Sequence, residues 1–412
     1  MSRGAAPGRT ITPDEAIRIV LDHASPLPAE ELPFIKTLGR VLAEPVTAQD
    51  DLPPFDRSAM DGFAVRSADA AVMGAVLTVV REIPAGAPAG ARIGAGEAAR
   101  IMTGAPIPPG ADAVQMQEET EPADTGRRVR LLKPVAAGEN VRRRGADVAA
   151  GQRLLEPGTR IRAHEVALLA TLGVVNPRVH SVPRIAILST GDEIVEPDQA
   201  PLPHQIRNSN AYLLRALASG MRIGSTSLGI AADDPEALRE RIRSGLDTDL
   251  LLMTGGVSVG AHDHVAGILR EEGAEILFHG VSVKPGKPLL FAARGRTLIF
   301  GLPGNPLSTA AMFGLFVAPA IRALRGEREP LPARVRGTLT GDLRQKPGRT
   351  WFALVSARFS SAGWQASPMT STGSGDLAAA CRANAFAVVP DAAEHLPAGA
   401  PVELILWGEG TA

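Results

Sequence analysis

The sequence has one cysteine, Cys381, among its 412 residues. A single thiol excludes an intrachain disulfide and a cysteine-rich metal site, and it favours a reducing compartment, so we expect the cytoplasm. Aromatic residues make up only 4% of the chain, too few for a platform that stacks on nucleic-acid bases. The net charge is −1 and the longest basic run is Arg142–Arg144. These features argue against a nucleic-acid partner.

Long apolar runs are also missing. We find no apolar stretch of the roughly 18 residues that a membrane helix needs, and the first residues lack the apolar core of a secretory signal. We therefore expect no membrane partner. Glycine (43) and proline (34) are instead abundant, which indicates many turns and strand-rich parts. A chain of this length is expected to form roughly two to four domains.

The apolar pattern changes along the chain. Short apolar runs cut by Gly and Pro predict an all-β module over 72–160, and a second β module, a barrel or sandwich, after Pro330. Between 184 and 325 strands and helices alternate, which predicts a mostly parallel sheet with helices on both faces. Thr12 and Asp234 are each followed by Pro, with Glu15 and Glu236 in the first turn after it, a pattern typical of capped helix starts.

The segment 249–264 combines a short apolar run, a glycine-rich turn and a helical pattern. Such a turn aims backbone N–H groups and a helix N-terminus at an anion. Gly255 and Gly256 open the turn, and Ser258 and Asp263 add a hydroxyl and a carboxylate. The alternative is an ordinary strand-to-helix turn in which the glycines only relieve backbone crowding.

Carboxylates follow several of the predicted strands. Glu193, Asp233 and Asp263 would suit Mg²⁺, which binds few protein carboxylates and completes its shell with water and substrate phosphates. Solvated turn acids are the alternative for Glu193. Helix capping is the favoured interpretation for Asp234.

Two basic residues, Lys284 and Lys287, flank Pro-Gly in a short loop. Held close together, they repel each other unless an anion lies between them, so the loop indicates either a phosphate or oxyanion site or a solvated turn. Asn305 and Pro306 place a helix start after another strand, a second predicted anion site. The arginine run at 142–144 is interpreted as a solvated face.

Seven motifs follow one another along nearly the whole chain. They lie at 55–64 (FDRSAMDGFA), 100–106 (RIMTGAP), 141–147 (VRRRGAD), 189–193 (STGDE), 255–260 (GGVSVG), 284–288 (KPGKP) and 302–308 (LPGNPLS). Seven ordered motifs are far more specific than any one of them. In this order they resemble the molybdopterin molybdenumtransferase (MoeA) family, which is related to the C-terminal domain of gephyrin.

The resemblance implies a multidomain α/β plus β fold with four domains. These are a discontinuous helical dimerisation domain (10–48 plus 150–182), a β-rich inserted domain (49–149), a central doubly wound α/β molybdopterin-binding domain (183–328) and a C-terminal β-barrel (329–412). It also implies a homodimer whose active sites are shared between subunits, and molybdopterin adenylyltransferase as an upstream partner.

For the function, the resemblance implies Mg²⁺-dependent insertion of molybdate into adenylated molybdopterin with release of AMP. Asp61 and Thr103 would come from the partner subunit, and Glu193, Asp233 and Asp263 would form the acidic set that binds Mg²⁺. The groups implied to hold molybdate, pterin and phosphates are Gly255, Gly256, Ser258, Lys284, Lys287, Pro288, Asn305, Pro306, Ser308, Arg349 and Ser374.

The chain departs from the family pattern at three positions. Gly280 and Leu354 stand where many relatives carry Lys and Arg, so a site for anions loses two cations, and we expect Arg349 to compensate. Asn208 stands where Asp is common. The lost cations favour an alternative function, a carrier or scaffold that binds pterin or molybdate without transfer. An enzyme for tungstate is a third possibility, because both ions are tetrahedral dianions of similar size.

Overall fold

The computed structural model describes residues 10–256 and 264–407, and these divide into two compact units. The larger unit comprises the chain up to Glu44, Pro157–Val166 and the chain from Asn176 onward. It contains an α/β sheet and a C-terminal barrel. The smaller unit comprises Pro45–Glu156 and Ala167–Val175 and is rich in strands.

A six-stranded sheet forms the centre of the larger unit. Its order is β16, β13, β17, β21, β20, β18. The first four strands pair in parallel, and β20 pairs antiparallel with both of its neighbours, β21 and β18. The strands are Ser225–Ala231 (β16), Ile185–Thr190 (β13), Leu250–Thr254 (β17), Thr297–Leu302 (β21), Leu290–Arg294 (β20) and Glu275–His279 (β18). Every residue of β17 is buried, because a strand covered on both faces has no solvent side. The predicted mostly parallel sheet is confirmed.

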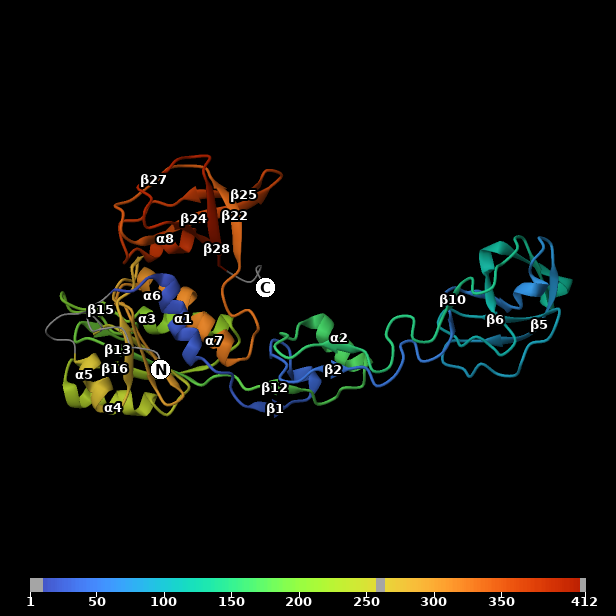
Figure 1. The fold of residues 1–412 in the computed structure, drawn as a ribbon, viewed down its shortest axis with the longest axis horizontal. Helices are drawn as coiled ribbons and strands as arrows, with labels where there is room; N and C mark the ends of the chain where they lie inside the picture. Colours follow the sequence, from blue (N-terminus) through green and yellow to red (C-terminus); the bar gives the residue numbers. More distant parts are fainter. Residues whose placement is uncertain (1–9, 257–263, 408–412) are drawn as a thin grey trace. The chain divides into compact units, whose positions relative to one another are not determined.

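Helices cover both faces of this sheet (Figure 1). Along β13, Ile185 and Ile187 enter the core that contains α1, α3, α6 and α7, whereas Ala186 and Leu188 enter the core that contains α4 and α5. This alternation follows from the two-residue period of a strand. The helices are Pro13–His23 (α1), Asn210–Gly220 (α3), Pro235–Gly245 (α4), Val265–Glu271 (α5), Pro306–Met312 (α6) and Ala318–Leu324 (α7). The doubly wound arrangement is confirmed.

Two helix starts follow the predicted capping chemistry. The Thr12 hydroxyl accepts a hydrogen bond from the Glu15 N–H at 3.2 Å, and Asp234 accepts one from the Ala237 N–H at 2.9 Å. Each bond satisfies an N–H that has no partner within the helix. Asp234 is therefore a capping residue, as predicted.

The segment Pro306–Leu324 is one continuous helix of 19 residues, with a π-helical stretch, Phe313–Val317, between α6 and α7. Its length and composition would allow it to cross a membrane, but 78% of its apolar window is buried within the protein. A helix covered by protein on most sides is a core helix. The expectation that no apolar stretch is long enough to cross a membrane is therefore wrong for this segment, although its burial makes it a core helix.

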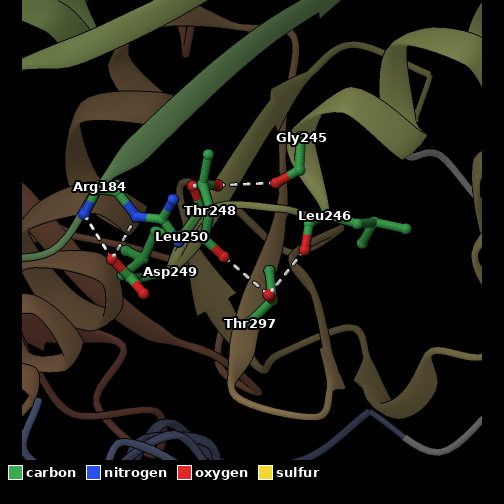
Figure 2. A network of polar contacts seen from close by, with 7 residues as sticks. All are labelled: Arg184, Gly245, Leu246, Thr248, Asp249, Leu250 and Thr297. Atoms are coloured by element: carbon green, nitrogen blue, oxygen red, sulfur yellow. Dashed lines mark hydrogen bonds and ion pairs between the residues drawn. The ribbon is translucent and has the colours of Figure 1, made fainter.

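A polar network ties the sheet together where β17 begins (Figure 2). Asp249 accepts a hydrogen bond from the Arg184 N–H at 2.8 Å. The Thr248 hydroxyl donates to the Gly245 carbonyl at 2.7 Å, and the Thr297 hydroxyl donates to the Thr248 carbonyl at 2.7 Å. These bonds satisfy backbone groups between α4 and β17 and fix where the strands start. They lie at the end of the sheet opposite to the candidate site.

The C-terminal segment closes into a five-stranded barrel, because β24 pairs with both β25 and β26. Its elements are Arg334–Leu339 (β22), Thr350–Ser360 (β24), Gly363–Pro368 (β25), Ala385–Val389 (β26) and Pro401–Leu406 (β28), with Leu343–Arg344 (β23), His395–Leu396 (β27) and the helix Leu377–Arg382 (α8). The short strand β19 (Val283–Lys284) pairs with β24 in parallel. The predicted barrel is confirmed, and β19 joins the basic loop to it.

A second six-stranded sheet forms the smaller unit, in the order β7, β4, β6, β5, β9, β8. Its strands are Gly62–Val65 (β4), Val76–Ile83 (β5), Glu97–Ile101 (β6), Ala113–Met116 (β7), Thr120–Ala123 (β8) and Arg128–Leu131 (β9). The arginines at 142–144 are exposed, as the interpretation of a solvated face requires. In chain order they also pair with Asp147, Asp56 and Asp51, and the last two pairs fasten distant loops of this unit to one another.

The segments expected to be helical, 10–48 and 150–182, contain α1, α2 (Ala163–Thr171) and several short strands. Four further pairs of short strands occur in the described residues. They are Ala29–Glu31 (β1) with Arg178–His180 (β12), Val46–Thr47 (β2) with Arg153–Leu155 (β11), Arg57–Ser58 (β3) with Val141–Arg142 (β10), and Ile194–Val195 (β14) with Ile206–Arg207 (β15).

Candidate functional site

The carboxyl ends of β13 and β17 form a switch point in the sheet. From β13 the chain crosses to β16 on one side and then returns to β17 on the other side. In sheets of this kind, ligands bind in the crevice that opens where the strand order reverses. The loops that follow β13, β16, β17 and β21 all leave the sheet at this edge, and they carry most of the site residues predicted from the sequence.

Gly255 and Gly256 form the turn after β17, and both have positive φ angles. A Cβ on Gly255 would lie 2.4 Å from the Thr190 carbonyl oxygen, and one on Gly256 would lie 2.7 Å from the Thr190 hydroxyl oxygen. The turn therefore requires glycine on both conformational and steric grounds. This bare backbone therefore packs closely against the end of β13. Ser258, predicted to follow it, lies outside the described residues.

Acidic residues from two neighbouring strand ends meet at this edge. The Asp233 N–H donates to the Asp192 carboxylate at 3.1 Å, and both side chains are exposed. Glu193 is also exposed and folds back over Gly191, whose Cβ position would lie 2.4 Å from the Glu193 carboxylate. Asp263, the third predicted carboxylate, lies outside the described residues. Within residues 10–256 and 264–407, no three acidic, His or Cys groups form a complete metal cluster.

Asn305 begins α6 at the end of β21, but its side chain does not cap the helix as its position suggested. The Asn305 Nδ2 group instead donates to the Ser374 Oγ at 2.8 Å, and the Leu307 N–H donates to the Ser374 carbonyl at 3.0 Å. The loop at 373–375 of the barrel is thereby held on the first turn of α6. Ser308 is buried in this turn, and Pro306 is half-buried beside it.

Lys284 and Arg349, predicted from different motifs, line the same pocket. The Lys284 Nζ lies 4.3 Å from the centre of the Trp351 ring, a cation–π contact that orients the ammonium group. Lys287, on the other side of Gly286, is exposed and does not line this pocket, and Pro288 is half-buried. The structure therefore pairs Lys284 with Arg349 rather than with Lys287. Arg344, Gln345 and Lys346 also line the pocket, and the sequence analysis missed them.

Leu354, expected from the sequence to remove a cation from an anion site, does not line the pocket of Lys284 and Arg349. Leu354 is 5% exposed and lies in an apolar cluster with Phe352 and Phe386. Gly280 also has a structural reason: its φ is +109°, a conformation that a lysine would adopt only with strain. Asn208 is buried, and its Oδ1 accepts hydrogen bonds from the Ser189 hydroxyl at 3.0 Å and the Ala211 N–H at 3.3 Å.

In the smaller unit, Asp61 and Thr103 come together as the sequence analysis grouped them. Asp61 Oδ1 accepts hydrogen bonds from the Thr103 N–H at 2.6 Å and from the Thr103 hydroxyl at 2.7 Å. The backbone bond first, and then the hydroxyl bond, lower the pKa of the Asp61 carboxyl below its usual range. This exposed carboxylate is thus held in its charged form.

Replacing Thr103 with valine is expected to raise the pKa of Asp61 part of the way towards its usual value of about 3.9, because the hydroxyl bond is lost and the N–H bond stays. A depressed folded-state pKa contributes stability above about pH 3.9, and this contribution is lost as the pH falls through the folded-state pKa. Carboxylate NMR chemical shifts measured against pH give the value. Thr78→Val on β5 is the control. An Asp61 that titrates at 3.9 or above in the wild type contradicts the assignment.

Comparisons with known proteins cover nearly the whole chain. Three family models match in order: "MoeA N-terminal region (domain I and II)" over residues 11–173, "Probable molybdopterin binding domain" over 186–323, and "MoeA C-terminal region (domain IV)" over 336–407. A molybdopterin molybdenumtransferase of Staphylococcus aureus (strain MRSA252) is 34% identical over 400 residues, which is 95% of this chain and 94% of the relative.

A second relative with the same name, from Staphylococcus epidermidis, is 34% identical over 96% of this chain and 95% of its own length. Among solved structures, the molybdopterin biosynthesis MoeA protein of Pyrococcus horikoshii OT3 is 30% identical, with a TM-score of 0.83 over 97% of this chain and all of that one. The identity, the coverage and the fold agree, and the chain belongs to the molybdopterin molybdenumtransferase (MoeA) family of molybdenum cofactor biosynthesis.

Proposed function

We propose that this chain inserts molybdate into adenylated molybdopterin and releases AMP in a Mg²⁺-dependent reaction. The relatives named above support the reaction class. The observation that carries the proposal is the bond between Asn305 and Ser374, which holds a barrel loop on α6 at the ligand-binding edge of the sheet. Groups from the barrel and from the strand-end loops thus contribute to one site.

The main task of this site is electrostatic. Molybdate, the phosphates and the pterin thiolates are all negatively charged, and preorganised cations and N–H groups lower the cost of bringing them together. Lys284, Lys287 and Arg349 supply positive charge, and Ser308 and Ser374 supply hydroxyl groups. The turn at Gly255 and Gly256 brings backbone peptide groups to the same edge of the sheet. Fixed positions then raise the rate of reaction between weakly reactive partners.

The acidic residues at the strand ends suit Mg²⁺. Asp192, Glu193 and Asp233 lie at adjoining strand ends, and Mg²⁺ takes one or two carboxylates together with water and phosphate oxygens. Glu193 and Asp233, joined by Asp263, are the residues that would hold it. When bound, the ion would neutralise charge on the adenylate phosphates so that water can cleave the phosphoanhydride.

We further propose a cytoplasmic homodimer in which Asp61 and Thr103 of one subunit complete the site of the other. The support is that the anion-binding groups lie in the larger unit whereas this carboxylate–hydroxyl pair lies in the smaller one. Recovery of AMP release on mixing Asp61→Ala and Lys284→Ala subunits is expected. A monomer by light scattering that is fully active contradicts the shared site.

The reaction is tested by AMP release from adenylated molybdopterin. The purified wild-type protein is expected to release AMP only when molybdate and Mg²⁺ are both present, and a tungstate arm shows which anion is used. AMP release that is independent of the oxyanion contradicts the proposal. Tight binding of pterin and molybdate without any AMP release replaces it with the carrier or scaffold function.

A further inference from the structure

A basic pocket of about 460 Å³ lies beside β19 and the barrel of the larger unit. Its lining residues are Lys284, Arg344, Gln345, Lys346 and Arg349. Four of the five are cations, and no carboxylate belongs to this lining set. Only Lys284 and Arg349 were expected from the sequence to act on substrate, so Arg344 and Lys346 are additional charges at the same place.

The backbone around these cations is fixed by hydrogen bonds at both ends of the loop. At one end the Gln345 N–H donates to the Glu394 carbonyl, and its side-chain Nε2 donates to the Pro390 carbonyl, both at 2.9 Å. At the other end the Ser282 hydroxyl donates to the Gly348 carbonyl at 2.9 Å. The ladder between β19 and β24 then sets Lys284 opposite Trp351. The charges therefore converge on the pocket because of the fold.

These positive charges are only partly neutralised. Arg344 is paired with Asp342 at 3.3 Å. Over the described ranges, no ion pair with a carboxylate is found for Lys284, Lys346 or Arg349. Like charges that share a pocket repel one another, and an anion placed between them removes this repulsion. One polar acceptor, the buried Gln345 Oε1, also lacks a hydrogen-bond partner there.

We infer that Arg344 and Lys346 make this pocket a docking site for a tetrahedral oxyanion, which it captures next to Lys284. The inference rests on the proposed function and extends it by two residues. The pocket is several times larger than the ~30 Å³ share of one water molecule, so it accommodates a hydrated anion or a phosphate ester. Molybdate and the phosphate of the adenylate share this chemistry.

The test is equilibrium dialysis of the full-length protein at low ionic strength. Three probes are used separately: molybdate, inorganic phosphate and AMP. The double variant Arg344→Ala/Lys346→Ala is compared with the wild type and with Arg358→Ala. Arg358 is an exposed arginine of the barrel strand β24 and does not line the pocket. Lys346→Glu is added as a charge reversal, and far-UV circular dichroism verifies that each variant is folded.

We expect the double variant to bind molybdate about tenfold more weakly than the wild type, a change of about 1.4 kcal/mol, and Arg358→Ala to bind it normally. Loss of phosphate and AMP binding with unchanged molybdate binding supports the oxyanion pocket and assigns it to the adenylate phosphate. Unchanged binding of all three probes in the double variant and in Lys346→Glu overturns the inference. A wild type that binds molybdate here but makes no cofactor refutes the proposed function alone.

Discussion

Replacing Lys284 with alanine is expected to lower the rate of molybdenum cofactor formation by at least about 100-fold, the scale of losing one key electrostatic contact in an active site. The fold orients Lys284, since β19 pairs with β24 and the Trp351 ring lies 4.3 Å from its ammonium group. The loss corresponds to about 2.7 kcal/mol of transition-state stabilisation. Initial rates at saturating adenylated molybdopterin measure it.

Two matched variants separate charge from fold in this experiment. Lys36→Ala removes an exposed lysine elsewhere in the larger unit and should leave the rate unchanged. Lys284→Arg keeps the positive charge and should retain more activity than Lys284→Ala. If Lys284→Ala stays within about threefold of the wild type, the ammonium group does not stabilise the transition state, and its place in the site must be abandoned.

The variant Leu354→Arg is expected to lose about 3–5 kcal/mol of stability, the scale of leaving a buried charge without a partner. From the sequence alone, an arginine at this position is expected to improve anion binding. In this chain, however, Leu354 is buried at 5% exposure among apolar side chains that include Phe352, Phe386 and Ile405. The urea midpoint of the unfolding transition is the measurement.

Leu354→Met is the control, because a swap of similar volume within a core usually costs less than about 1.5 kcal/mol. Leu354→Arg should thus unfold at much lower urea than Leu354→Met, with weaker rather than stronger molybdate binding. A Leu354→Arg protein as stable as the wild type that also binds molybdate more tightly would show that this side chain reaches the anion site.

Much of the fold could be predicted because its signals are local. A capping residue followed by Pro predicts the helices that begin after Thr12 and Asp234. Short runs of consecutive apolar residues likewise predict the strands β13 and β17. The position of the site also follows, since parallel strands bring their following loops to one edge. Glu193, Asp233 and Asn305 lie at that edge for this reason.

The rest depends on contacts between residues far apart in the chain. Arg143 and Asp56 are 87 positions apart, so the ion pairs of the exposed arginine run could not be predicted from the sequence. Arg344 and Lys346 carry no motif, and only the joining of β19 to β24 brings them to Lys284. The core position of Leu354 depends on how the barrel packs, which residue spacing does not reveal.

Direct measurement of molybdenum transfer tests the central claim. The wild-type protein is incubated with adenylated molybdopterin, Mg²⁺ and molybdate, the pterin is then separated from the protein, and its molybdenum content is determined by mass spectrometry beside the AMP released. Insertion predicts one molybdenum atom in the pterin for each AMP, and nearly none with Lys284→Ala. Pterin that leaves without molybdenum, while AMP accumulates or molybdate stays on the protein, contradicts insertion by this chain.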